Sequence, residues 1–346
     1  MTLNFNETSI GKIITHFVGA KTQEEPFKLS KEETAVEQDT RTFLLKYFLS
    51  TFKGEEAYQF VNDHPLVVHA LVKGIFENEA SFVEQSQKLA RLLYDRSEHP
   101  KIKGGELNVV LFRYAVMDGN PLDAIGIFKT ETKDAFLKMS DFTSRYQIKH
   151  ELGIGVNSLD KGCVIFNTES ADGYRVFLSD KVSKPSGDAQ YWAQEFLELQ
   201  PLSDAFHNTK NFLSLTKSFV TDQLGDDEEM SGADKVDLLN RSMDFFKSRD
   251  QFVKKDFETE VLQQPRIIKS FQSYNNDVFA DNEEAAIYDR FDISSHAVKR
   301  QQSNFKSVLK LDKNFHVYIH GDRSLIEHGV EPNGRKYYKL YYNEET

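Results

Sequence analysis

Leu107–Glu131 reads LNVVLFRYAVMDGNPLDAIGIFKTE, and this stretch decides the fold. Two apolar runs, Leu107–Met117 and Ala124–Glu131, flank the sequence Asp118-Gly119-Asn120-Pro121. Adjacent Gly and Asn residues are typical of tight turns, and runs rich in Val, Ile and Phe favour strands. The stretch therefore predicts two long strands that form an antiparallel hairpin.

Further elements surround this hairpin along the chain. A strand is expected over Ile10–Val18, and one amphipathic helix follows a capping box made by Ser30 and Glu33, with a second over about Asn78–Tyr94. Three more segments are expected to continue the sheet: Tyr146–Leu152, Gly162–Asn167 and Tyr174–Ser179. Together they predict an N-terminal α+β domain over residues 1–184, built on a mostly antiparallel sheet.

The second half of the chain has a different pattern. The run Lys181–Asp188 has the composition of a linker, and helical periodicity dominates afterwards. Three strands close the chain: Phe305–Leu311, Phe315–His320 and Arg335–Tyr342. Residues 185–346 are therefore predicted to form a helix-rich region followed by a small C-terminal β-meander of three strands.

The composition sets limits on the class of protein. A chain of 346 residues with 39% hydrophobic residues can bury a sizeable core. Its single cysteine, Cys163, lies in an apolar run and is expected to be a buried structural thiol, which excludes a disulfide framework and a Cys-rich zinc site. No apolar run reaches the roughly 20 residues that cross a bilayer. We therefore expect a cytoplasmic protein with no membrane partner, no cofactor and no metal.

The segment Val298–Leu340 reverses the sign of the chain's charge. It holds nine lysines and arginines against four acids, a net +5 in a chain of formal charge −11, so the remainder carries −16. Tyrosines are interleaved with these cations. Cations contact nucleic-acid phosphates, and flat rings stack on bases. Ordinary cross-strand pairing of Lys and Tyr on a half-solvated sheet is the alternative explanation.

Strand alternation assigns this segment two faces. His316, Tyr318 and His320 share one face of their strand, and Arg335, Tyr337, Lys339 and Tyr341 share one face of the last strand. If the apolar faces pack inward, these residues form a basic and aromatic surface. The candidate nucleic-acid-binding residues are Lys299, Arg300, Lys306, Lys310, Lys313, His316, Tyr318, His320, Arg335, Tyr337 and Lys339.

Glu131-Thr132-Lys133 offers a different chemistry. Some metal-dependent nucleases place an acid, any residue and a lysine at the end of a strand, where the acid holds Mg²⁺ and the lysine assists the attacking water. A second carboxylate would have to come from Glu106, which the predicted hairpin brings near Lys133. A surface ion pair between Glu106 and Lys133 explains the same spacing without catalysis.

Four segments together resemble a known family. They are Gly126–Glu131, Asn157–Cys163, Phe305–Asp312 and His316–Gly321, and they occur in this order. The chain is similar over most of its length to the bacterial nucleoid-associated protein family NdpA, also called YejK. The resemblance implies a location in the nucleoid and association with DNA, without an established enzymatic activity.

These observations predict a nucleoid-associated protein that is not an enzyme and binds DNA through its C-terminal basic and aromatic surface. Two alternatives stay open. One is a nuclease that uses Glu106, Glu131 and Lys133 with a divalent metal. The other is an adaptor that reaches DNA only through protein partners, which the net charge of −11 favours. The candidate partners are DNA of either strand form, other nucleoid proteins and further copies of the chain.

Overall fold

The computed structural model describes residues 1–54, 56–61, 67–98, 102–180, 191–224, 230–279, 289–305, 308–319 and 323–344. Contacts divide the chain into two compact units, Met1–Leu202 and Ser203–Thr346. The boundary that the sequence predicts, between 184 and 185, lies outside the described residues, as does the linker run Lys181–Asp188. Within the described part of the chain, no helix is both long enough and apolar enough to cross a bilayer.

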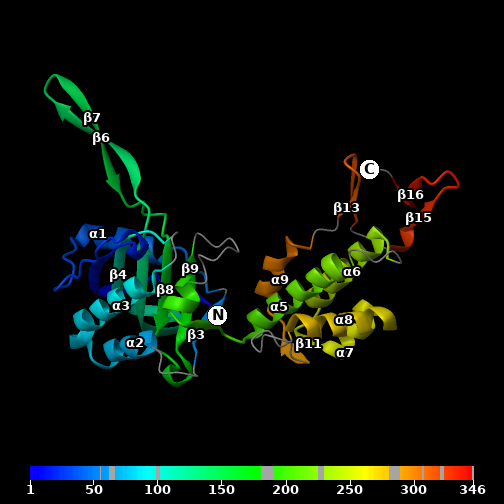
Figure 1. The fold of residues 1–346 in the computed structure, drawn as a ribbon, viewed down its shortest axis with the longest axis horizontal. Coiled ribbons are helices and arrows are strands. Elements are labelled where there is room, and N and C mark those ends of the chain that lie inside the picture. Colours follow the sequence, from blue (N-terminus) through cyan, green and yellow to red (C-terminus); the bar gives the residue numbers. More distant parts are fainter. Residues whose placement is uncertain are drawn as a thin grey trace. The chain divides into compact units, whose positions relative to one another are not determined.

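An eight-stranded antiparallel sheet forms the centre of the first unit (Figure 1). The strand order is β1-β4-β5-β8-β9-β3-β10, and β2 also pairs with β4. The strands are β1 (Leu3–Asn4), β2 (Ser9–Val18), β3 (Ala57–Phe60), β4 (Gly105–Met117), β5 (Asn120–Thr130), β8 (Lys161–Phe166), β9 (Arg175–Asp180) and β10 (Leu199–Pro201). The predicted hairpin is confirmed as β4 and β5, and the sheet confirms the predicted α+β class.

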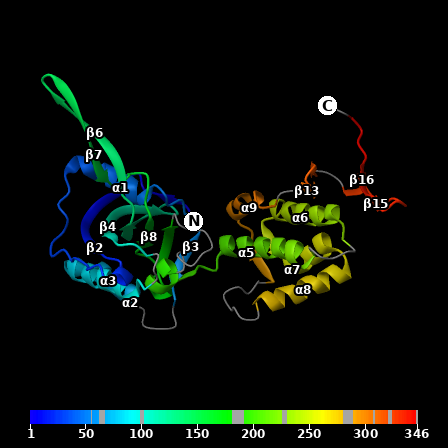
Figure 2. The same ribbon diagram turned by 45° about the horizontal axis from the view of Figure 1, so that its top comes forward.

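Helices cover both faces of this sheet (Figure 2). They are α1 (Gln38–Leu49) on one face, and α2 (Val67–Glu77) and α3 (Phe82–Arg96) on the other. Val109 and Leu111 enter the core beneath α2 and α3, whereas Val110 and Phe112 enter the core beneath α1. Because both faces are buried, β4 is a continuous apolar run and shows no alternation with polar residues.

Cys163 is the structural thiol that the sequence predicts. It lies in β8 and is fully buried. Burial raises the pKa of this thiol far above its ordinary value, because the thiolate would lose its hydration. The side chain therefore packs as a small apolar group, and it is inaccessible to thiol reagents in the folded protein.

The first helix begins later than the sequence predicts. Ser30 and Glu33 do not form a capping box: the Ser30 hydroxyl donates to the Thr15 carbonyl over 2.5 Å, and Glu33 pairs with Lys12 at 2.5 Å. The helix starts only at Gln38. Both polar side chains hold an extended segment against β2, so their long-range contacts outweigh the local capping preference.

Five helices and one short pair of strands form the core of the second unit within the described residues. They are α5 (Ala205–Ser218), α6 (Gly232–Lys247), α7 (Lys254–Phe257), α8 (Pro265–Phe279) and α9 (Ser295–Gln302), with β11 (Gln251–Val253) paired to β12 (Arg290–Asp292). The fully buried Phe212 ring lies 4.3 Å from the Phe252 ring and 4.8 Å from the Phe257 ring, measured between centroids. A cluster of phenylalanines therefore holds this unit together.

The C-terminal strands form two separate two-stranded sheets, where the sequence predicts one three-stranded sheet. β13 (Val308–Leu311) pairs with β14 (Phe315–Tyr318), and β15 (Ile326–Val330) pairs with β16 (Lys336–Leu340). β15 has the sequence IEHGV, whose glycine and charged residue give no apolar alternation. The last strand, β16, therefore pairs with β15, a strand that the sequence pattern does not predict.

The predicted strand Tyr146–Leu152 does not continue the central sheet. It is part of β7 (Arg145–Gly153), which pairs with β6 (Asp134–Phe142) in a sheet of its own. The two strands project from the first unit as an arm (Figure 1). The sequence pattern identifies β7 as a strand but cannot identify its partner.

Candidate nucleic-acid interface

The β13–β14 hairpin turns a cation and two rings outward. Lys310 lies opposite His316, and Tyr318 lies on the same face. His316 and Lys310 are exposed, and 66% of Tyr318 is accessible. Leu309 and Val317, on the other face, pack toward the body of the unit. Val317 and Ile319 therefore lie inward as predicted, whereas Phe315, which the alternation also predicts to lie inward, is 64% exposed.

The β15–β16 hairpin has the same division. Tyr338 packs inward with the buried Ile326, whereas Tyr337 and Lys339 lie on the opposite face. The ring of Tyr337 lies across Gly329, where any added Cβ would come within 2.6 Å of the tyrosine hydroxyl. The glycine thus allows the ring to lie flat on the strand, with 41% of the residue accessible.

Lys339 interacts with two neighbours on the outer face of β16. Its Nζ lies 3.4 Å from Glu327 Oε2 and 5.7 Å from the centre of the Tyr341 ring. Hydrogen bonds to Tyr341 and to Glu327 raise the pKa of Lys339, so the side chain is charged at neutral pH. The ammonium group is more than half exposed and can exchange Glu327 for another anion.

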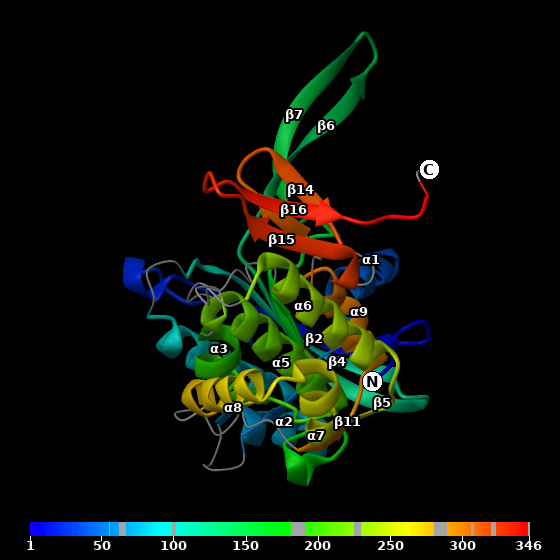
Figure 3. The ribbon, with the colours of Figure 1, turned by 90° about the vertical axis from the view of Figure 1, so that its right-hand side faces the viewer.

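Both hairpins are anchored on α6 through one small apolar cluster (Figure 3). Leu309 lies in β13, Ile319 directly follows β14, and Ile326 lies in β15. Ala233 and Val236 lie at the start of α6. This shared cluster brings the two hairpins to the same part of the second unit. The two hairpins are therefore held together by packing and not by strand pairing.

The Arg323 side chain links β15 to α6 through two contacts. Its Nε donates to Asp234 over 2.7 Å, and its Nη1 donates to the Ile326 carbonyl. Asp234 also closes a capping box with Ser231 at the start of α6. Burial acts to raise the pKa of Asp234, but hydrogen bonds from Ser231 and Arg323 lower it overall, so the carboxylate stays charged. We therefore leave Arg323 out of the DNA-contacting set.

The structure distributes the predicted binding residues over three elements. Lys299 and Arg300 lie on α9, which packs against α5 and α6. Lys306 and His320 lie outside the described residues. The two hairpins carry the remaining residues, which we call the C-terminal platform: Lys310, Lys313, His316, Tyr318, Arg335, Tyr337 and Lys339.

The residues of the nuclease alternative fall into two ion pairs. Lys133 Nζ lies 2.5 Å from Glu106 Oε1, which confirms the proximity that the predicted hairpin implies. Glu131 pairs elsewhere, with Lys129. Among the described residues, no three His, Cys, Asp or Glu side chains are grouped so that they could hold a metal ion. The geometry here is that of the surface ion pair between Glu106 and Lys133.

Glu131 belongs to a buried cluster that sequence reasoning missed. Lys129 is fully buried in β5, and its Nζ lies 3.0 Å from Glu131 Oε1 and donates to the Lys103 carbonyl over 2.7 Å. The Asp160 carboxylate accepts from the backbone N–H groups of Glu131 and Thr132 over 2.7 and 2.9 Å. The cluster neutralises a buried ammonium group, which indicates a structural role for Glu131.

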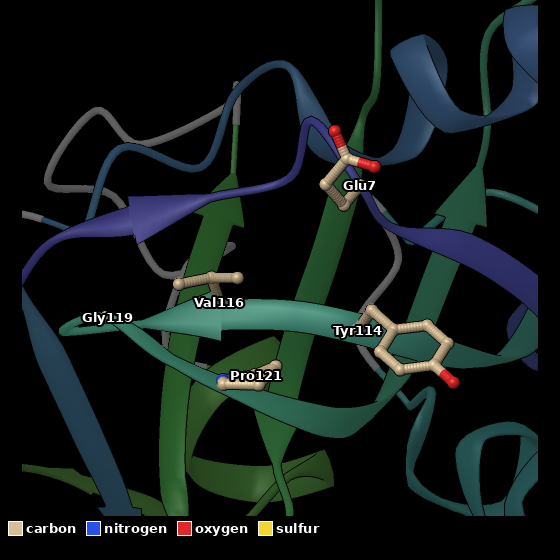
Figure 4. A pocket seen from close by; sticks show the side chains of 5 residues that line it. All are labelled: Glu7, Tyr114, Val116, Gly119 and Pro121. Carbon is tan, nitrogen blue, oxygen red and sulfur yellow. The ribbon is translucent and has the colours of Figure 1, made fainter.

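An open hollow beside the β4–β5 turn is a second feature that the sequence does not indicate (Figure 4). Its volume is about 540 Å³, and it is lined by Glu7, Tyr114, Val116, Gly119 and Pro121. Tyr114 has a φ of +57° at a bulge in β4, which no local sequence signal reveals. The lining offers one carboxylate and one phenol but no cation, so it does not suit a phosphate group, and we assign it no function.

Comparison with known proteins gives one result for the whole chain. A family model described as nucleoid-associated protein YejK matches residues 14–345. The match includes both units and the C-terminal platform. No curated protein matches the chain.

Proposed function

We infer that this chain, which belongs to the nucleoid-associated protein YejK family, binds DNA directly through the C-terminal platform. The observation that carries the proposal is the interleaving of cations and rings on the exposed faces of two adjacent hairpins. Phosphates interact with the cations, which fix the position of a nucleic acid. Exposed rings offer stacking surfaces to unpaired bases. We attribute no catalytic step to the platform.

The charges of the platform are available for contact. Lys310, Lys313 and Arg335 form no ion pair with any residue that the structure describes. The platform lies in the segment of net charge +5, whereas the rest of the chain carries −16. A local positive field on an acidic protein directs DNA to that one surface and away from the others. This supports contact through a patch over coating of DNA by the whole protein.

An adaptor that reaches DNA through protein partners is the competing function. The net charge of −11 favours it, because the long-range field repels a polyanion. The adaptor predicts no affinity of the purified chain for DNA at any salt concentration. No observation in the structure favours the nuclease alternative.

The test is a binding titration of the purified protein against duplex DNA at several salt concentrations. If the platform neutralises about three to five phosphates, log K should fall with log salt at a slope of about −3 to −4.5. Binding that does not depend on salt would rule out the platform, and no binding at low salt would rule it out and support the adaptor.

Single-stranded DNA distinguishes stacking from charge. Replacing the exposed Tyr337 by alanine should weaken single-strand binding by ~1–3 kcal/mol if a base stacks on its ring, with little change for duplex DNA. Tyr338 lies next to it in sequence but packs inward, so Tyr338→Ala should lower the melting temperature instead. If Tyr337→Ala unfolds the protein and Tyr338→Ala does not, the faces of β16 are assigned the wrong way round.

A further inference from the structure

The β6–β7 arm is exposed along its whole length. All its residues from Asp134 to Leu152 are exposed, except Ser140, which is half-buried, and the arm ends at the half-buried Gly153. A two-stranded ribbon on its own is only marginally stable in water. Packing of another protein surface against one face would bury side chains of this ribbon and stabilise it.

The register of the arm sorts its side chains onto two different faces. Residues directly opposite each other share a face, as Met139 and Ile148 do. Five large apolar side chains make up most of one face, which we call the apolar arm face: Leu137, Met139, Tyr146, Ile148 and Leu152, each between 60% and 70% exposed. Ala135, Asp141 and His150 lie on the same face. The other face carries Lys138, Arg145 and Lys149, two acids, and the exposed Phe136 and Phe142. The ribbon is therefore amphipathic, as a strand pair is when one face is buried.

We propose that the apolar arm face binds the same face of a second copy of this chain, so that the protein is a homodimer joined through its arms. The five side chains expose roughly 600 Å², and monomeric proteins rarely leave an apolar patch of that size uncovered. Two such faces together bury about 1,200 Å², the lower end of the range for specific protein interfaces. A second copy thus supplies the area that a stable contact requires.

The charge of the arm also favours a second copy. Three cations and three acids between residues 134 and 153 leave it without net charge, and Lys138 pairs with Glu151 at 3.1 Å. Two copies of a chain of charge −11 repel each other, but the arm is neutral and projects from the first unit (Figure 1). A nucleic acid would require cations on this face, but the apolar arm face has no lysine or arginine, and its ionisable side chains besides Tyr146 are Asp141 and His150.

The contact is expected to be symmetric. A two-fold interface brings the same patch of each subunit together, so the residues nearest the axis touch their own copies. Met139 and Ile148 lie opposite each other in the middle of the apolar arm face, with Leu137 on one side and Tyr146 on the other. These two residues are therefore assigned to the neighbourhood of the axis.

The experiment compares two variants. Each adds two charges to one pair of opposite residues in the arm, and the two pairs are neighbours along the strands. Met139→Glu with Ile148→Glu places the charges on the apolar arm face, and Ser140→Glu with Gln147→Glu places them on the other face. Sedimentation velocity of the full chain gives the mass. Wild type and the second variant should sediment at twice 39.9 kDa, and the first variant at 39.9 kDa.

A monomeric wild type, or a first variant that is still dimeric, overturns the proposal. It is equally overturned if wild type is monomeric and the first variant loses DNA affinity, because the face would then contact nucleic acid. Cross-linking gives a second readout that needs no charged substitution. Met139→Cys should form a covalent dimer with a bifunctional maleimide and Ser140→Cys should not, while the natural Cys163 is fully buried and does not react.

Discussion

Replacing Glu131 by alanine is expected to destabilise the first unit by about 3–5 kcal/mol, since it leaves a buried ammonium group without its carboxylate partner. Lys129 is fully buried, and its Nζ lies 3.0 Å from the Glu131 carboxylate. Lys161, also buried, is the cross-strand neighbour of Lys129 and adds a second positive charge. The free energy of unfolding, measured in urea by circular dichroism, reports the loss.

The loss should depend on pH in a defined direction. Burial lowers the pKa of Lys129 in the folded protein, and the charge of Glu131 acts to raise it. Removing Glu131 therefore lowers this pKa further. Between the lowered pKa and the ordinary value of the unfolded chain, the unfolded state binds more protons, so stability rises with pH. Above the acid range in which carboxylates protonate, the deficit of Glu131→Ala should be constant up to the pKa of Lys129 in the variant. It should shrink as the pH rises from there to the higher pKa of Lys129 in the wild type.

Two companion variants test the cause of this effect. Lys133→Ala removes the neighbouring lysine, which is 47% exposed and pairs with Glu106, and should cost only about 0–1 kcal/mol. Lys129→Met in the Glu131→Ala background removes the orphaned charge and should restore most of the stability. Equal small losses in Glu131→Ala and Lys133→Ala would show that Lys129 does not depend on Glu131.

The central hairpin of the first unit could be predicted because its signals are local. Two apolar runs and a Gly-Asn turn specify that β4 pairs with β5, although not the bulge at Tyr114 that shifts their register, and this pairing brings Glu106 close to Lys133. Strand alternation likewise gives the inward side of Tyr338 and the outward side of Tyr337. Each of these inferences needs only the period of a strand and the position of a turn.

Pairings between distant or weakly patterned segments could not be predicted. The alternation in β7 indicates an apolar face but not what covers it, so Tyr146–Leu152 was assigned to the central sheet and its partner β6 was missed. The strand β15 has too few apolar residues to be recognised, and the partner of β16 was missed with it. The ion pair of Arg323 with Asp234 has no local signal either, because Asp234 lies 89 residues earlier in the chain.

Removing two cations of the C-terminal platform should have the largest effect on DNA binding. Each neutralised phosphate contributes about 0.9 log units to the affinity at 0.1 M salt, which is about eightfold. Arg335→Ala with Lys339→Ala should therefore weaken duplex binding about 60-fold and make the salt slope shallower by about two. Fluorescence anisotropy at several salt concentrations measures both quantities.

A matched control on the first unit separates the platform from a general charge effect, and a change of opposite sign on the same strand pair tests the direction of the response. Glu327 is the acid that pairs with Lys339, so Glu327→Gln frees that ammonium group and should tighten duplex binding. Lys73→Ala with Lys88→Ala removes two exposed lysines from the first unit and should leave binding and slope almost unchanged. If this control weakens binding as much as the platform variant does, DNA responds to the total charge of the chain and the platform has no special role. If instead only the platform variants respond, the outer face of β15 and β16 takes part in the contact, because the control removes as much total charge as Arg335→Ala with Lys339→Ala does.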